Sequence, residues 1–506
     1  MVQKYHQYSS AVPYFQDAAE PGIPELDQFR LQSYGLYEQF YWNHPESYRL
    51  LQRGEDEAPL YLPTPKQIVE ATNRFLAKNF DFTVGKETGT ENDQSMLDQT
   101  IRDFLKRERF WPKFNAQRRY GLVRGDAVWH ITADDTKPEL TRISLHALHP
   151  SRYFAITDPN DPEHVIGAHL VDVVPDPKDD TKQLARRQTY RKTETGAVTS
   201  ECALFQIGKW DDRFLKPNDI KQEAVITPVT ELPPAITAIP VYHIPSDWSA
   251  GQVFGSSLLR GIETIAAAVN QVASDTALGW AIATLGSYWT NASPPLDPAT
   301  GLATAWEIGP LRMTEVPMDR TVGRLEGIGS VQPAVDLMDY ITASGMRGAG
   351  VPDIAAGKVD VAVAESGISL KLQLAPILAA NEEREAEMLG VYDQMFFDLV
   401  TMWFPTYESI TSDTRVVTVV DDPLPKNREA EIKEIVDLMT AKVISTEEAR
   451  AKLIELGGWD IEASAEGVLA EVAATAAASD PFGQRVNNEL NQDPSAQPAP
   501  QEAPVG

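Results

Sequence analysis

The chain has 506 residues, a mass of 55.9 kDa and a formal net charge of −28 at pH 7. This acidity excludes a protein that grips nucleic acid over a broad basic surface, because such surfaces neutralise phosphates with Lys and Arg. An acidic wall along which DNA slides stays open. No apolar run of about 18 residues is present, and the first residues lack a secretory core, so neither a transmembrane helix nor a signal peptide is expected.

The single cysteine, Cys202, excludes an internal disulfide. No Cys/His cluster with metal-ligand spacing accompanies it, so neither a structural metal nor a cofactor is expected. We interpret Cys202 as a half-buried residue of a strand.

The first part of the chain is predicted to be helical. Residues 1–33 have no clear period and are assigned to an N-terminal extension. Helices are predicted at 33–51, at 65–79 with Thr64 as N-cap, and at 92–117, where Leu97, Ile101 and Phe104 fall on one face.

Basic and aromatic residues alternate at the end of the third helix. We favour a solvated helix face with apolar anchors, and a nucleic-acid patch is the alternative. The basic residues are Arg102, Lys106, Arg107, Arg109, Lys113, Arg118 and Arg119.

Residues 121–245 change to short β-rich segments broken by turns. Strands are predicted at 127–132, 142–148, 165–174, 189–192 and 203–208, with turns at 159–162 and 195–196. Such hairpins predict an antiparallel sheet packed on the preceding helices, in an α+β arrangement.

A helix of about six turns is predicted at 256–285. Its apolar positions step by three and four from Leu258 to Val272, and alanines lie beside them. This pattern favours close packing against other helices, including copies of itself.

The remaining segments alternate between breaks and helices. Residues 286–329 predict turns with strands at 302–308 and 322–325. A short helix at 331–344 leads into a flexible run at 345–350, and a long helix at 364–404 should kink at Pro376. Further helices are predicted at 427–442 and from Ser445, whose spacing to Glu448 forms a capping box, before a disordered tail beyond 480.

The sequence specifies no reaction, so an enzyme is not expected. The segment 350–359 resembles a phosphate-binding loop only in composition, since its spacing is wrong and Val359 replaces the metal-binding hydroxyl. His146 and His149 are interpreted as strand residues on opposite faces. The paired acids at 134–135, 179–180, 211–212 and 421–422 are assigned to solvated turns.

Four local patterns from residue 254 onward, in this order, resemble the portal proteins of long-tailed bacteriophages. The first opens a helix at 254–258 and includes Asn270 and Asp275. The second is the glycine-bearing loop 350–357. The third comprises Ser366, Gly367, Leu370, Lys371 and Pro376, with Ser369 where an alanine is more usual. The fourth pairs 425–427 with 443–449.

The resemblance implies an α+β portal fold with a helix/antiparallel-sheet wing, a helical stem, a small α/β clip and a helical crown. The implied parts are a wing at 34–254, a first stem helix at 255–285, a clip at 286–329, a second stem helix at 330–348, a channel loop at 349–363, a long kinked helix returning to the wing at 364–422, a crown at 423–475 and a disordered tail at 476–506.

The implied function is that of a ring of about twelve copies at one capsid vertex of the virion, assembled in the host bacterial cytoplasm. Its partners would be double-stranded DNA in the channel, the large terminase subunit, a head–tail adaptor, and the major capsid and scaffolding proteins, with no membrane. Arg347, Gly350 and Lys358 would face DNA, with Arg347 or Lys358 touching phosphates weakly; for both, a solvated or inter-subunit ion-pairing role is the alternative. A nucleic-acid-acting phage enzyme and a non-ring structural adaptor remain alternatives for the whole chain.

Overall fold

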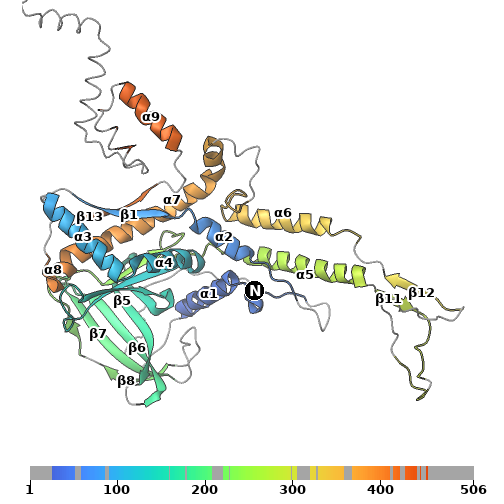
Figure 1. Ribbon diagram of the computed structural model, residues 1–506. Coiled ribbons are helices and arrows are strands. Elements are labelled where there is room, and N and C mark those ends of the chain that lie inside the picture. The colour runs from blue at the N-terminus through green and yellow to red at the C-terminus, as the bar shows by residue number, and fades with distance from the viewer. Residues whose placement is uncertain are drawn as a thin grey trace, which may run out of the picture. The chain divides into compact units, whose positions relative to one another are not determined.

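The computed structural model describes residues 25–51, 59–85, 91–158, 160–176, 179–207, 220–226, 228–285, 287–297, 299–304, 319–325, 329–357, 367–410, 414–421, 428–441, 445, 449 and 452–453. The chain divides into two compact units, Met1–Pro423 and Leu424–Gly506. Helices and antiparallel sheets together make the first unit an α+β protein (Figure 1), as the sequence predicted. Among the described residues, no helix is long and apolar enough to cross a membrane.

Two helices open the described chain, α1 (Glu25–Tyr41) and α2 (Thr64–Asn73). The assignment of 1–33 to an extension is therefore wrong from Glu25 onward, because Leu31 and Tyr34 of α1 pack into a core with the largest sheet. In α2, Thr64 is already helical and Pro63 precedes it without a side-chain cap, so the predicted Thr64 cap is wrong.

The single helix predicted at 92–117 is two helices, α3 (Glu91–Arg107) and α4 (Phe110–Arg124). The chain turns at Arg109, whose φ of 54° lies in the left-handed region. The break lets both helices face one core, since α3 buries Phe104 and α4 buries Phe110 and Phe114 completely or nearly so.

Every pair between the described strands is antiparallel. The strands are β1 (Asn79–Val84), β2 (Asp126–Ala133), β3 (Ile143–Leu148), β4 (Tyr153–Asp158), β5 (Asp161–Asp176), β6 (Asp179–Lys192), β7 (Val198–Ile207), β8 (Ile220–Ile226), β9 (Thr230–Glu231), β10 (Val241–Pro245), β11 (Ser287–Thr290), β12 (Val322–Leu325) and β13 (Val416–Asp421). They form sheets in the orders β10-β2-β3, β4-β5-β6-β7-β8 with β9 beside β7, β1-β13 and β11-β12.

The predicted strands are confirmed in position for their described residues. The turn predicted at 159–162 is shorter, because Asp161 and Pro162 already belong to β5. Three interpretations of acid pairs and histidines are wrong. Asp179 and Asp180 begin β6 instead of forming a turn. His149 lies outside β3 and its ring accepts a hydrogen bond from the Ser151 N–H at the start of a 3₁₀ turn. Within 421–422, Asp421 ends β13. Cys202 is half-buried in β7, as predicted, and residues 211–212 lie outside the described chain.

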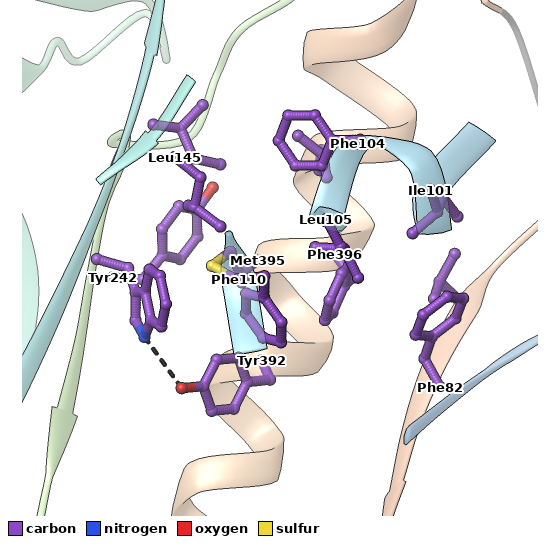
Figure 2. Close-up of a cluster of buried hydrophobic side chains, with 14 of the residues drawn as sticks. Phe82, Ile101, Phe104, Leu105, Phe110, Leu145, Tyr242, Tyr392, Met395 and Phe396 are labelled. Carbon is purple, nitrogen blue, oxygen red and sulfur yellow. Dashed lines mark hydrogen bonds between the residues drawn. The ribbon is translucent and has the colours of Figure 1, made fainter. Parts of the chain in front are cut away.

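The main core joins α3, α4 and α7 (Gly367–Asp398) to the sheet β10-β2-β3 and to the pair β1-β13. Figure 2 shows aromatic rings from these elements meeting around Tyr392. The indole N–H of Trp129 donates to the Tyr392 hydroxyl at 3.0 Å, so this buried polar pair is satisfied inside the apolar cluster.

α7 continues through Pro376, which lies inside the helix without ending it, and Figure 1 shows the ribbon changing direction in its N-terminal part. A π-helical turn at Leu399–Trp403 and a short helix α8 (Phe404–Tyr407) extend it. The prediction of one long helix to 404 is confirmed for its described residues, 367–404.

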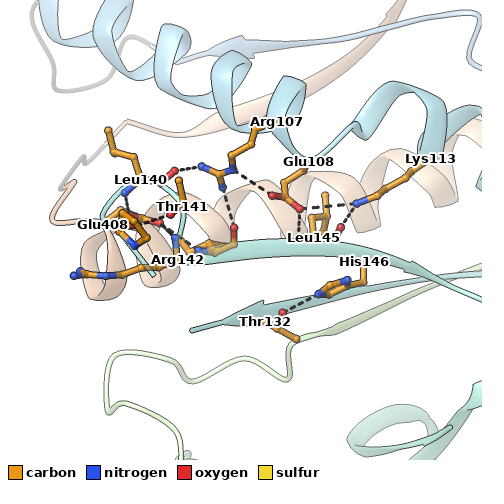
Figure 3. A network of polar contacts seen from close by, with 12 residues as sticks. Arg107, Glu108, Lys113, Thr132, Leu140, Thr141, Arg142, Leu145, His146 and Glu408 are labelled. Carbon is orange, nitrogen blue, oxygen red and sulfur yellow. Dashed lines mark hydrogen bonds and ion pairs between the residues drawn. The ribbon is translucent and has the colours of Figure 1, made fainter. Parts of the chain in front are cut away.

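A carboxylate after α8 holds the loop between β2 and β3. Glu408 has 3% of its surface exposed and accepts hydrogen bonds from the backbone N–H groups of Leu140, Arg142 (2.8 Å) and Ile143 (3.2 Å). Arg107 donates to carbonyls of the same loop (Figure 3). The arrangement fixes this loop to the end of the α7–α8 helix.

A Glu408→Ala variant should therefore lose stability, because the buried Ile143 N–H and the partly buried Arg142 and Leu140 N–H groups would lose their acceptor, at up to about 1–3 kcal/mol for a buried group. We expect the melting temperature to fall by several degrees, since about 1 kcal/mol moves it by about 2–4 °C in domains of 150–250 residues. Glu139→Ala, at an exposed position of the same loop, is the control. Equal melting temperatures for the two variants would contradict the role of Glu408.

In the second unit, α9 (Arg428–Thr440) confirms the helix predicted at 427–442. The Ala449 N–H donates to the Ser445 carbonyl at 2.9 Å, which fits a helical turn beginning at Ser445. Residues 446–448, with the capping-box glutamate, and the predicted tail lie outside the described residues.

Candidate functional site: the paired helices

Two helices distant in sequence lie side by side, α5 (Glu263–Leu285) and α6 (Gln332–Gly348), with β11 and β12 between them in sequence and beyond their far ends in Figure 1. A Cβ added to Gly345 would lie 2.9 Å from Cγ2 of Ile265, so the absence of a side chain sets the close approach of the helices. The predicted flexible run is wrong over 345–348, because this contact holds these residues in α6.

α5 begins at Glu263 and not at 256 as predicted, because the preceding residues form turns that include Gly261 with a φ of 88°. The predicted apolar stripe is confirmed in part: Leu258, Ile262 and Val269 are buried. Of the strands predicted nearby, 322–325 is confirmed as β12. At 302–308 only an isolated bridge from Ala303 to Leu296 is present, and residues from 305 lie outside the described chain.

The inner half of α5 binds the extended segment before α2 through polar side chains. Asn270 is fully buried and its carbonyl oxygen accepts from the Leu62 N–H at 2.7 Å, while Ser274 accepts from the Leu60 N–H at 2.9 Å. Burial raises the pKa of nearby Tyr48 to about 12, so its hydroxyl stays protonated and donates to Asn43. The motif residue Asn270 thus anchors the helix.

A second anchor lies before α5, where two backbone segments cross. Asp126 is fully buried and accepts from the Gly255 N–H at 2.9 Å, from His243 at 2.7 Å and from the Tyr34 hydroxyl. The Ser256 N–H also donates to the Ser246 carbonyl at 2.7 Å. The spacing of apolar residues does not predict this hydrogen-bonded crossing, although Gly255 belongs to the first portal-like pattern.

The outer half of α5 has no comparable cover. From Thr264 to Thr284 the only charged residue is Asp275, which accepts from Gln271 at 3.0 Å. Between Ala277 and Thr284 no residue is buried, and Trp280 keeps 47% of its surface exposed. A helix that is apolar on all sides is normally buried. This half of α5 therefore needs a partner surface.

α6 also exposes apolar side chains, with Tyr340 69% and Leu337 47% exposed. On its other side, a groove of about 680 Å³ separates it from α2. The lining of the groove includes Lys66, Gln67, Glu70 and Arg74 on the α2 side and Val335, Asp339 and Met346 on the α6 side, with Asp353 beyond them.

The predicted channel-loop residues are only partly described. Arg347 is in the last turn of α6, with 67% of its side chain exposed and an ion pair of 3.9 Å to Asp353. Gly350 follows with a φ of 73°, while Lys358 lies outside the described residues. The described part of the loop is anchored, because Val351 is fully buried.

The motif before the long helix is described in part. Gly367 is the first residue of α7 and Pro376 lies inside it. Leu370 and Lys371 belong to the same helix, with side chains outside the described set, as is all of Ser366.

Five of the seven cations in the basic stretch 102–119 bond within the chain, although Arg102 and Arg107 among them stay exposed, and this pairing disfavours the interpretation of the stretch as a nucleic-acid grip. Phe110 and Phe114 are core residues. The cations bond within the chain: Arg102 to Asp98, Arg107 to the Ile143 carbonyl, Lys113 to the Leu145 carbonyl, Arg118 to the Leu76 and Ala77 carbonyls, and Arg119 to Glu70. Within the described part of the chain, no group of three His, Cys, Asp or Glu is placed to hold a metal ion.

No family model and no curated protein matches the chain. Among solved structures, 108 chains match. One belongs to a structure described as "Virion of native gene transfer agent (GTA) particle", with 12% sequence identity and a TM-score of 0.43 over 83% of this chain and 93% of that chain. A likeness at this level carries no argument about function, which therefore rests on the residues and geometry above.

Proposed function

We propose that the chain is a portal subunit of a tailed bacteriophage or prophage: a non-enzymatic component of a ring through which DNA enters and leaves the capsid. The observation that carries this proposal is the outer half of α5, which is apolar around its circumference and yet unburied in the single chain. Copies of the same helix pair standing around a common axis would bury it.

Two further features support the ring. Asn270, Gly367 and Pro376 of the portal-like motifs lie at structural positions on α5 and α7. The paired helices carry few charges: after Glu263 they contain the acidic Asp275, Asp336 and Asp339 and one basic residue, Arg347, in the last turn of α6. An acidic lining would keep DNA from binding tightly and would let it slide.

In this proposal α5 and α6 form the stem, and β11 and β12 belong to the clip that docks the terminase motor and later the head–tail adaptor. The other sheets and α3, α4 and α7 form the wing, and α9 belongs to the crown. A nucleic-acid-acting enzyme is the less favoured function, because the basic stretch 102–119 is bonded mainly within the fold.

The purified chain should assemble into annular particles with a central hole, visible by negative-stain microscopy. Light scattering after size exclusion should give about 670 kDa if about twelve copies of 55.9 kDa close the ring. Nuclease and ATPase assays on the same particles should give no turnover. A sample that stays at 55.9 kDa under all conditions, with no annular particles, would refute the proposal.

A further inference from the structure

We propose that the groove between α2 and α6 of one copy receives the Leu337–Tyr340 face of α6 from the next copy. This inference rests on the proposed ring and names the surfaces that join its neighbours. The occupant of the groove is then a second copy of this chain, bound head to tail.

The two surfaces lie on opposite sides of the same helix. With 3.6 residues per turn, Val335, Asp339 and Met346 share one face of α6, and these residues line the groove. Leu337, Tyr340 and Ser344 fall on the opposite face, and all three are exposed. A copy cannot fill its own groove with this face, so in the proposed contact the face belongs to another copy.

The dimensions suit this occupant. The groove holds about 680 Å³, within the range of about 300–1,000 Å³ that buries ligands of drug size, so it has room for the Leu337 and Tyr340 side chains together. Tyr340 is 69% exposed, and tyrosine is among the residues enriched at the energetic centres of interfaces.

Charge supports the same pairing. The α2 wall of the groove carries Lys66 and Arg74 beside Glu70, and the Glu70 carboxylate is already paired with Arg119 at 2.9 Å. Asp336 lies next to Leu337 at an exposed position of α6. When Tyr340 of one copy enters the groove of the next, this carboxylate would approach the cationic wall.

The geometry also decides the type of assembly. A contact between two different patches is heterologous, and repetition of it generates a ring or an open filament rather than a two-fold dimer. The continuous apolar surface of the outer half of α5, on the same helix pair, would be covered by the same neighbours.

Thiol cross-linking tests the contact directly. In a Cys202→Ser background, Tyr340→Cys and Gln67→Cys place one thiol on each surface, since Gln67 is exposed on the groove wall. The double variant treated with a short bismaleimide should give a denaturing-gel ladder rising from dimer toward the full ring. Each single variant alone should give no ladder, whereas a mixture of the two single variants should give cross-linked dimers.

Point variants supply the second measurement. Tyr340→Lys should lower the fraction of chain in rings by at least about tenfold at a concentration where half of the unchanged chain is assembled. Met96→Lys is the matched control, because Met96 on α3 is also 69% exposed and should leave assembly unchanged.

The outcomes separate this inference from the proposed function. Rings that form without a ladder in the double variant, and that tolerate Tyr340→Lys, would overturn the groove contact while the portal proposal stands. Cross-linking of Tyr340→Cys alone would point to a two-fold contact and would also overturn it. Absence of any ring from the unchanged chain would instead contradict the proposed function.

Discussion

A Trp280→Lys variant should remain as single subunits or small oligomers at concentrations where the unchanged chain forms rings. Trp280 is 47% exposed on the outer half of α5, where no residue between Ala277 and Thr284 is buried. Lysine at this position would remove the apolar side chain from the contact and bury a charge without a counter-charge. Truncation of a tryptophan at an interface centre alone costs about 2 kcal/mol or more. The loss repeats at every contact of a ring, so light scattering should register a change from about 670 kDa toward 55.9 kDa.

The matched control is Trp248→Lys. Trp248 is 39% exposed and lies before α5, with its indole N–H donating to the Gln252 carbonyl at 2.7 Å. We expect this variant to form rings like the unchanged chain. Equal assembly of the two variants, or an equal loss, would show that the outer half of α5 is not the surface that copies share.

Much of this helix pair could be predicted from the sequence because its signals are local. The steps of three and four from Leu258 onward identified α5, and the strand candidate at 322–325 matched β12. The start of α5 was wrong because Gly261 turns the chain before the helix, although Leu258 and Ile262 on either side continue the apolar spacing. Periodicity reports burial, and buried turn residues can mimic a helix.

Other elements were set by contacts that no local pattern contains. β1 pairs with β13 across more than 300 residues, and neither strand was predicted. The turn at Arg109 separates α3 from α4 three residues before Pro112, which lies in the first turn of α4 and is a local signal for a helix start. The position of Phe110 in the core, by contrast, is set by contacts with distant elements. Tertiary packing overrides local propensity at such points.

One part of the candidate assembly surface could be predicted from the sequence and another part could not. The apolar stripe and the neighbouring alanines of α5 suffice to predict contact with other copies, because both are local features of one helix. The groove between α2 and α6 could not be predicted, because Lys66 and Val335 are brought together only by the fold. The residue Gly345 was interpreted as part of a hinge, and its role in the contact with Ile265 becomes visible only when the two helices are side by side.

Gly255→Ala should prevent the first unit from folding correctly. A Cβ at this position would lie closer than 3.0 Å to the carbonyl oxygens of Ser246 and Gly125, which are backbone atoms held in hydrogen bonds. Moving Gly255 away would also break its N–H bond to the buried Asp126 carboxylate at 2.9 Å. We expect a loss above about 4 kcal/mol, the exceptional range for one substitution, seen as a much lower melting temperature or insoluble protein.

Gly390→Ala provides the matched control, since Gly390 lies inside α7 and no atom is within 4 Å of an added Cβ. Alanine in a helix interior should stabilise the protein by up to about 1 kcal/mol relative to glycine. The two glycine-to-alanine changes should therefore shift the melting temperature in opposite directions. If Gly255→Ala had the same melting temperature as the unchanged chain, the two backbone segments that cross before α5 would not be held as closely as their hydrogen bonds imply. That result would contradict a rigid connection between α5 and the sheet β10-β2-β3.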